Sequence, residues 1–123
     1  MKTTMQIFLF IAALFLPETT KAQSAIYLCT TTGTYGYCYG NNYVSTCAYE
    51  NCIKNGGKHP TQITYSSRKG YGAIATGRDF NGVPIVGAAA GCKTEEEAIK
   101  NAKHACISTG AQSASIAETF YDE

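Results

Sequence analysis

The sequence predicts an α+β domain with two helices packed on one face of an antiparallel sheet. Six segments show the alternation of apolar and polar residues, or the enrichment in apolar and aromatic residues, that is typical of strands. Two further segments carry helix start and stop signals. The order strand, strand, helix, strand occurs twice, and such mixed runs are typical of a small α+β fold.

The elements expected in the first half are two strands, a helix and a third strand, at residues 25–29, 35–39, 45–55 and 61–66. The first two strands flank the polar segment 30–34, which predicts a hairpin. Ser45 or Thr46 is expected to begin the helix. The pair Gly56 and Gly57 is expected to end it.

The elements expected in the second half are again two strands, a helix and a strand, at residues 71–76, 83–88, 94–109 and 113–121. The turn segment 79–82 joins the two strands as a second hairpin. Thr94 and Glu97 form a capping box, in which the threonine hydroxyl accepts from the backbone N–H of Glu97 and the glutamate reaches back. Gly110 is expected to end the helix.

Residues 25–66 and 71–121 are therefore expected to be two ββαβ repeats within one disulfide-stapled domain. The aligned positions are 51–56 with 104–110, Leu28 with Ile74, and Gly40 with Gly87. The alignment needs gaps because the second helix is longer. Chance similarity between short ββαβ units is the alternative explanation.

Residues 1–22 are expected to be a secretory signal peptide, since Lys2 precedes the apolar run 7–16 and small residues precede a cut after Ala22. A membrane-spanning helix needs about 20 apolar residues, so this run is too short to span. The mature chain is expected to be one domain, residues 23–123, that is secreted or periplasmic and does not insert into a membrane.

The charge balance argues against nucleic acid as a partner. The whole chain has ten basic and nine acidic side chains, and Lys2, Lys21 and Glu18 lie in the predicted leader. The remaining charges cancel, so no basic face large enough to neutralise several phosphates is expected. The same balance argues against an anionic membrane as the main partner.

Six cysteines in a small exported chain predict three disulfides, formed among Cys29, Cys38, Cys47, Cys52, Cys92 and Cys106. No metal site is expected because no pair has C-x-x-C spacing.

A hairpin that turns at Gly33 and Thr34 places Cys29 opposite Cys38, near disulfide range, which makes Cys29–Cys38 the best pairing. If the repeats pack about a pseudo-two-fold axis, the remaining expected pairs are Cys52–Cys106 and Cys47–Cys92.

The same register places Leu28 opposite Tyr39, on a face shared with Ile26, Tyr35 and Tyr37. This parity predicts that the tyrosine row faces the helices as part of the core. The alternative is an exposed aromatic strip for a sugar or a peptide, because tyrosine combines rigid apolar area with a polar tip.

Few residues suggest catalysis. His59 precedes a proline in a predicted loop, and His104 lies on the polar flank of the second helix. The consecutive glutamates 95–97 are explained by the helix dipole, and neighbouring helix positions point apart. No catalytic residue and no cofactor are therefore expected.

The second half carries YGAIA at residues 71–75, a glycine-bearing hairpin, and GCKTEEEAI at residues 91–99 on a helix that continues to Cys106. In this order these motifs resemble a family of small secreted bacterial domains, the domain of unknown function 4189. The resemblance covers about residues 71–121 and implies an exported, disulfide-stabilised module with no catalytic residues to carry over. The family usually has a further cysteine just after the helix, and residues 110–113 have none.

The sequence is thus interpreted as an exported binding or inhibitory module that acts on a protein or an envelope glycan and has no catalysis of its own. The candidate surface is the first hairpin tip and its surroundings, with Thr31, Thr32, Tyr35, Asn41, Asn42 and Tyr43. One alternative is a small secreted hydrolase or toxin that uses His59 or His104. Another is a structural surface or matrix component.

Overall fold

The structure, a computed structural model, describes residues 23–123, so the predicted leader lies outside the described residues. Six strands and two helices follow one another as β1 (Ser24–Cys29), β2 (Thr34–Tyr39), α2 (Val44–Lys54), β3 (Thr61–Ser66), β4 (Gly70–Arg78), β5 (Pro84–Cys92), α3 (Glu95–Ser108) and β6 (Ser115–Asp122). The order strand, strand, helix, strand therefore occurs in each half, as predicted.

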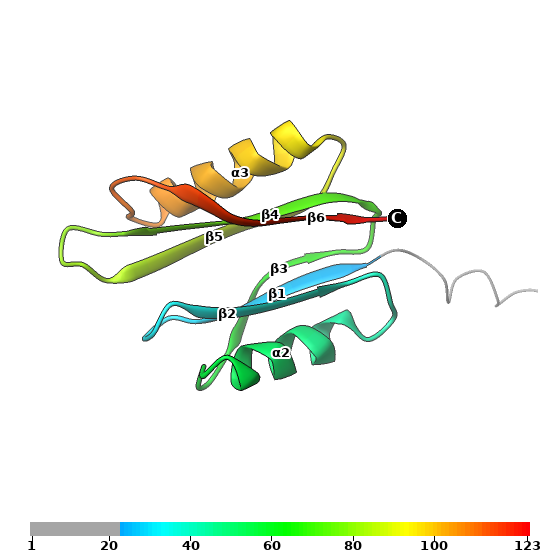
Figure 1. Ribbon diagram of the computed structural model, residues 1–123, viewed down its shortest axis with the longest axis horizontal. Coiled ribbons are helices and arrows are strands. Elements are labelled where there is room, and N and C mark those ends of the chain that lie inside the picture. Colours follow the sequence, from blue (N-terminus) through cyan, green and yellow to red (C-terminus); the bar gives the residue numbers. More distant parts are fainter. Residues whose placement is uncertain (1–22) are drawn as a thin grey trace, which may run out of the picture.

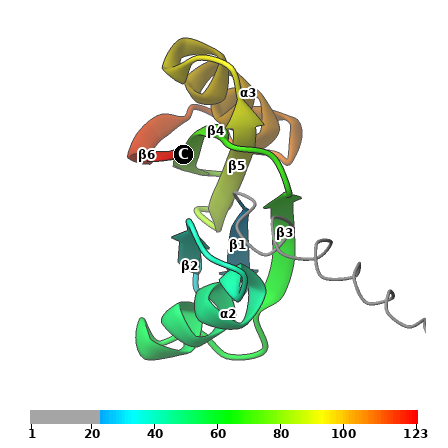
Figure 2. The same ribbon diagram turned by 90° about the vertical axis from the view of Figure 1, so that its right-hand side faces the viewer.

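The strands form two antiparallel three-stranded sheets, in the orders β2-β1-β3 and β5-β4-β6. The α+β class is confirmed, but the single sheet with both helices on one face is replaced by four layers. Figure 1 shows α2, the first sheet, the second sheet and α3 stacked in that order, and Figure 2 shows the same layers from the side. Each half closes its own sheet because β3 returns to β1 and β6 returns to β4.

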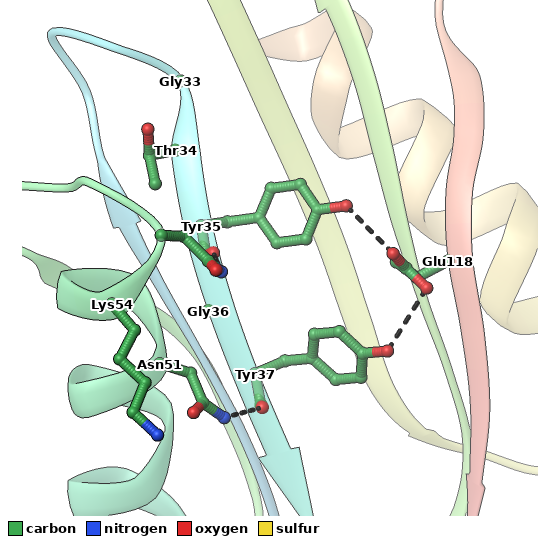
Figure 3. Close-up of a pocket in the computed structure, with 9 residues that line it drawn as sticks. Gly33, Thr34, Tyr35, Gly36, Tyr37, Asn51, Lys54 and Glu118 are labelled. Atoms are coloured by element: carbon green, nitrogen blue, oxygen red, sulfur yellow. Dashed lines mark hydrogen bonds between the residues drawn. The ribbon is translucent and has the colours of Figure 1, made fainter.

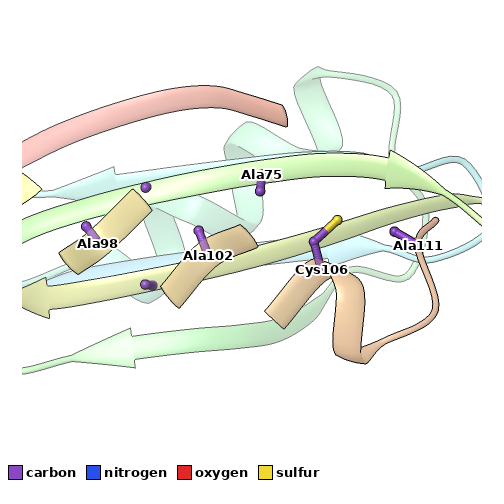
Figure 4. Close-up of a cluster of buried hydrophobic side chains, with 7 residues drawn as sticks. Ala75, Ala98, Ala102, Cys106 and Ala111 are labelled. Atoms are coloured by element: carbon purple, nitrogen blue, oxygen red, sulfur yellow. The ribbon is translucent and has the colours of Figure 1, made fainter. Parts of the chain in front are cut away.

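Each helix lies directly on the strands beneath it. The contact under α3 is built from small side chains, with Ala75, Ala98, Ala102 and Cys106 among them (Figure 4). On β5, a Cβ at Gly87 would overlap the backbone nitrogen of Cys106. Small residues thus allow the helix and strand backbones to approach closely, which a larger side chain would prevent.

The two sheets bury a second core between them, formed by Ile26, Leu28, Ile74, Val86 and Phe120. The Phe120 ring occupies the space that a Cβ on Gly72 would need. It stacks on Tyr37 and Tyr39, with ring centroids 5.4 and 4.8 Å away. The tyrosine row therefore shares a face with Ile26 and Leu28, as predicted, but packs against the second sheet and not against a helix.

The helix ends are only partly as predicted. At α3, Thr94 Oγ1 accepts from the Glu97 N–H at 3.0 Å, and Glu97 Oε1 accepts from the Lys93 N–H at 3.0 Å. Helix α2 instead begins at Val44 without a side-chain cap. Gly56 and Gly110 follow the two helices with φ of 100° and 127°, a conformation that glycine adopts without strain.

Corresponding positions in the two halves can be read from the packing. Gly36 lies against the backbone of Cys52 as Gly87 lies against that of Cys106. A register shift follows Ile26 in the first sheet and Ile74 in the second. Ile26 therefore corresponds to Ile74 and Gly36 to Gly87, which corrects the predicted matches of Leu28 with Ile74 and Gly40 with Gly87. That the two halves arose by duplication stays a prediction.

The disulfide in the structure joins Cys38 and Cys47, whose Cα atoms are 5.8 Å apart. The predicted pairs Cys29–Cys38 and Cys47–Cys92 are therefore wrong. The first hairpin turns earlier than expected, because the Gly33 N–H donates to the Cys29 carbonyl at 2.9 Å and Cys29 faces Thr34.

The pair Cys52–Cys106 is also wrong, because these residues belong to the two outer layers and both are free thiols. Cys29 and Cys92 are also free, so residues 23–123 contain one disulfide and the prediction of three is wrong.

Candidate functional site

A pocket of about 380 Å³ opens beside β2, where α2 and β6 approach the strand (Figure 3). Its lining residues are Gly33, Thr34, Tyr35, Gly36, Tyr37, Asn51, Lys54, Asn55 and Glu118. Strand β2 supplies its floor, the last turns of α2 supply one wall, and Glu118 reaches it from the second sheet. Stacking of the two sheets thus brings Glu118 to a pocket whose other lining residues belong to the first half.

Two tyrosines hold the Glu118 carboxylate. Tyr35 donates its hydroxyl to Glu118 Oε2 at 3.4 Å, and Tyr37 donates to Oε1 at 3.2 Å. Alternate residues of a strand point to the same face, so Tyr35 and Tyr37 project side by side from β2 toward β6 (Figure 3). Each carboxylate oxygen thus receives one hydroxyl from the opposite sheet.

Burial raises the pKa of Tyr35 and of Tyr37, and the negative charge and hydrogen bonds of Glu118 raise both further. The two phenols are therefore neutral donors throughout the physiological pH range. The arrangement fixes a carboxylate in a half-buried place by direct hydrogen bonds.

Two asparagines tie α2 to the strand behind the tyrosines. Asn51 Nδ2 donates to the Tyr37 carbonyl at 3.0 Å, and Asn55 Nδ2 donates to the Tyr35 carbonyl at 2.9 Å. These bonds use the amide nitrogens, so the side-chain oxygens remain as acceptors at the pocket wall. With Lys54 on the same wall, the pocket combines a cation, a carboxylate, amide oxygens and aromatic edges.

The structure separates the predicted site residues. Thr31 and Thr32 are exposed at the turn between β1 and β2, whereas the segment 41–43 follows the opposite end of β2 (Figure 1). Six strand residues span about 20 Å, so these two groups do not form one surface. Of the predicted set, Tyr35 alone lines the pocket. The group at the opposite end of β2, away from Thr31 and Thr32, consists of Asn41, Asn42 and Tyr43.

Sequence reasoning missed Glu118 and the wall formed by Asn51, Lys54 and Asn55. A signal for Glu118 was present, because a charged residue stands two positions before Phe120, on the strand face that packs between the sheets. A register shift turns Ile116 to the other face, where it packs in the core under α3. Nothing comparable marks the α2 residues, which are ordinary polar residues on a helix. Their role depends on where the helix packs.

The alternative catalytic residues stay apart. His59 and His104 are both exposed, in the loop after α2 and on α3. Within residues 23–123, no three His, Cys, Asp or Glu side chains gather in a way that could hold a metal ion. In this same range, no helix has both the length and the apolar character needed to cross a membrane.

No family model matches the chain, and searches of curated proteins and of solved structures find no similar protein. The resemblance of residues 71–121 to the domain of unknown function 4189 stays a prediction.

Proposed function

We propose that this chain is an exported binding module that holds a glycan in the pocket formed by Tyr35, Tyr37, Asn51, Asn55 and Glu118, without catalysis of its own. The observation that carries the proposal is the Glu118 carboxylate, fixed by two tyrosine hydroxyls at the side of an open polar pocket. Carboxylate and amide oxygens accept hydrogen bonds from sugar hydroxyls, and tyrosine adds rigid apolar area.

Rigidity supports a role in binding. The disulfide Cys38–Cys47 and the amides of Asn51 and Asn55 fasten α2 to β2 before any ligand arrives. A preformed site loses little conformational entropy when it binds. The pocket volume of about 380 Å³ lies in the range of small-molecule sites, which begins at about 300 Å³.

Export is supported by the predicted leader and is compatible with the disulfide, since disulfides persist in oxidising compartments. We infer a periplasmic or extracellular location, where envelope glycans are available. A bacterial source follows only from the resemblance of the second half.

The direct test is a titration of the mature protein with oligosaccharides from the bacterial cell wall. Binding is monitored through the amide chemical shifts in NMR spectra. We expect shifts at Tyr35, Tyr37 and Asn55, and at least a tenfold weaker affinity in Glu118→Ala. Glu96→Ala, on the exposed start of α3, is the matched control and should bind normally. Unchanged affinity in a folded Glu118→Ala protein would contradict the proposal.

The enzymatic alternative is tested by replacing His59 and His104 together. The double variant should keep the glycan affinity of the unmodified protein, because neither side chain lines the pocket. A hydrolytic activity that disappears in this variant would instead support a small secreted hydrolase or toxin. Self-association at high concentration without ligand binding would support a structural matrix component.

A protein partner is favoured by one observation outside the pocket. Phe80 is 88% exposed at the tip between β4 and β5. The tip is held rigid, because Asp79 Oδ1 accepts from the N–H groups of Asn81 and Val83 at 2.8 and 2.9 Å. Arg78 also donates to the Gly82 carbonyl at 2.7 Å.

A rigid turn that presents an aromatic side chain suits insertion into an apolar pocket of another protein. Loss of a captured protein in Phe80→Ser, with glycan binding intact, would support this second function. Capture that is equal in Phe80→Ser and in the unmodified protein would exclude the tip as its contact.

A further inference from the structure

Two free cysteines meet at one point of the first half. Cys29 ends β1 and Cys52 lies in the last turns of α2. A Cβ on Gly57 would lie 2.8 Å from Cys52 Sγ and 3.2 Å from Cys29 Cβ. Gly57 thus lies against both cysteines, and a side chain at this position would collide with them.

The two thiols differ in their surroundings. Cys29 Sγ lies 3.2 Å from Thr31 Oγ1. Hydrogen bonds from the hydroxyl of Thr31, then that of Thr32 and the backbone of Lys58, lower the pKa of Cys29 to about 6. Burial raises the pKa of Cys52, which donates to the Thr34 carbonyl at 3.5 Å. The hydrogen bonds thus favour the thiolate form of Cys29, whereas Cys52 favours the thiol.

Both side chains are buried, at 2% and 0% exposed, so only a small disulfide suits them as oxidant. We propose that Cys29 and Cys52 are a redox-active pair that forms a second disulfide by exchange with a small-molecule disulfide such as oxidised glutathione. A rotation about χ1 of Cys29 moves its sulfur from Thr31 toward Cys52, since the Cys29 Cβ already borders the same space as Cys52 Sγ. The new bond would join the end of β1 to the end of α2.

The exchange balances as two substitutions at sulfur. The Cys29 thiolate attacks oxidised glutathione, which forms a mixed disulfide and releases one glutathione thiolate. Cys52 then loses its proton and attacks the sulfur of Cys29, which releases the second glutathione thiolate. The pair is oxidised by two electrons, and the glutathione disulfide is reduced to two thiols.

The second half lacks this pair. Cys106 corresponds to Cys52, but Gly77 stands at the position of Cys29 and Ala111 at that of Gly57. A Cβ on Gly77 would lie 3.0 Å from the Ala111 Cβ. Cys92 contacts Asn101 Nδ2 at 3.9 Å. Cys92 and Cys106 are therefore expected to remain thiols.

The test is differential alkylation and peptide mapping of the full mature chain, equilibrated in glutathione buffers of graded potential. We expect Cys29–Cys52 and Cys38–Cys47 as the two linked peptides in oxidising buffer, with Cys92 and Cys106 alkylated. Cys29→Ser should leave Cys52 alkylated, whereas the control Cys92→Ser should leave both links unchanged. Mapping of the unmodified protein decides the question even if a variant fails to fold.

Two results would overturn the proposal. One is alkylation of Cys29 in oxidised protein that already carries Cys38–Cys47. The other is a link from Cys29 to any cysteine except Cys52.

A second inference starts from Asp122, which is 1% exposed at the end of β6. Its Oδ2 accepts from the Ser24 hydroxyl at 3.3 Å, while Oδ1 has no hydrogen-bond partner among residues 23–123. The backbone of Gln23 faces the same carboxyl group, and the Gln23 carbonyl accepts from the Gly40 N–H at 3.0 Å. A buried carboxylate with an unpaired oxygen is costly.

The geometry points to an ion-pair partner for Asp122 that is created when the leader is cut off. Hydrolysis of the Ala22–Gln23 peptide bond consumes one water, leaves the carboxylate on the leader and creates an α-ammonium group on Gln23. That group would stand beside Asp122 and form a buried ion pair. This inference rests on the predicted export and cut. The ion pair would make the processed chain more stable than its precursor.

The test compares a chain that begins at Gln23 with one that retains Ala22, each with and without Asp122→Asn. We expect a higher thermal midpoint for the chain that begins at Gln23, by several degrees. Asp122→Asn should lower the midpoint of this chain but not that of the longer one. Glu123→Gln is the matched control and should change neither, and mass spectrometry should verify that Gln23 has not cyclised.

Equal midpoints for the two chains would overturn the inference, as would an effect of Asp122→Asn that is the same in both. N-terminal sequencing of the exported protein tests the cut separately. Glycan binding is measured on the same samples, so failure of the ion pair is distinguishable from failure of the proposed function.

Discussion

The hydrogen bonds of Glu118 connect β6 of the second sheet to Tyr35 and Tyr37 of the first sheet. The ionisation of these two tyrosines therefore shows whether the hydrogen bonds are present. The pKa of Tyr35 and of Tyr37 is raised by burial and by Glu118. The neutral phenols therefore contribute to the stability of the fold. This contribution is complete below about pH 10, the pKa of tyrosine in the unfolded chain, and it is lost as the pH rises through the higher pKa of the folded protein.

We expect these two tyrosines to ionise after the exposed ones in an absorbance titration, and Glu118→Gln to bring their titration to lower pH. The thermal midpoint should fall above pH 10, with a smaller fall in Glu118→Gln. Tyr49→Phe, at a half-exposed position, is the control. Titration of Tyr35 and Tyr37 together with the exposed tyrosines would contradict the described contacts.

Gly87 is the residue that lets α3 rest on β5. A Cβ there would overlap backbone atoms of Cys106, so Gly87→Ala must push the helix away. Overpacking of this kind costs about 1 to 3 kcal/mol. We expect a loss of stability in this range in urea unfolding, whereas Ser113→Ala on an exposed position should cost little. An unchanged midpoint in Gly87→Ala would show that the helix lies farther from the strand.

At the scale of elements, the disulfide Cys38–Cys47 joins β2 to the first turn of α2, with a sequence separation of 9. A loop of this size gives an expected stabilisation of about 2 to 3 kcal/mol. Replacing both cysteines by serine should lower the free energy of unfolding by this amount. Cys92→Ser should have a smaller effect, because Cys92 is not bonded to another cysteine in the structure.

The elements and their order could be predicted from hairpin signals, the capping box and the terminal glycines, but the pairing within the first hairpin could not. The polar turn contains several residues at which the chain could reverse, and Gly33 closes it with φ of 73°. The expected register places Cys38 opposite Cys29, where the structure places Thr34. This shift is an even number of residues, so the tyrosines remain on the predicted face while every cross-strand partner changes.

At the scale of the whole molecule, the stacking of the sheets could not be predicted from one alternating face per strand. A signal lies in the central strands β1 and β4, where consecutive residues are buried because one face meets a helix and the other meets a sheet. Ala25 and Ala73 pack under the helices, whereas Ile26 and Ile74 pack between the sheets. The pocket depends on this stacking, since Glu118 and Tyr37 come from opposite sheets.

The four-layer arrangement predicts that neither half is stable alone. In the isolated segment 67–123, α3 would cover one face of the sheet, while Ile74, Val86 and Phe120 on the other face would lose the first half that covers them. Exposure of such a surface favours association. If the halves arose by duplication, a second copy of 67–123 can take the place of the first half.

We therefore expect this segment to be a dimer in analytical ultracentrifugation, with Ile74→Glu preventing dimerisation and unfolding the chain. Mixing it with the segment 23–66 should replace the dimer by a one-to-one complex, because the natural interface also contains the bonds of Tyr35 and Tyr37 to Glu118. A folded, stable monomer of 67–123 would contradict the argument. It would mean that the helix-covered face alone holds each sheet together, and that the core between the sheets serves to position the pocket.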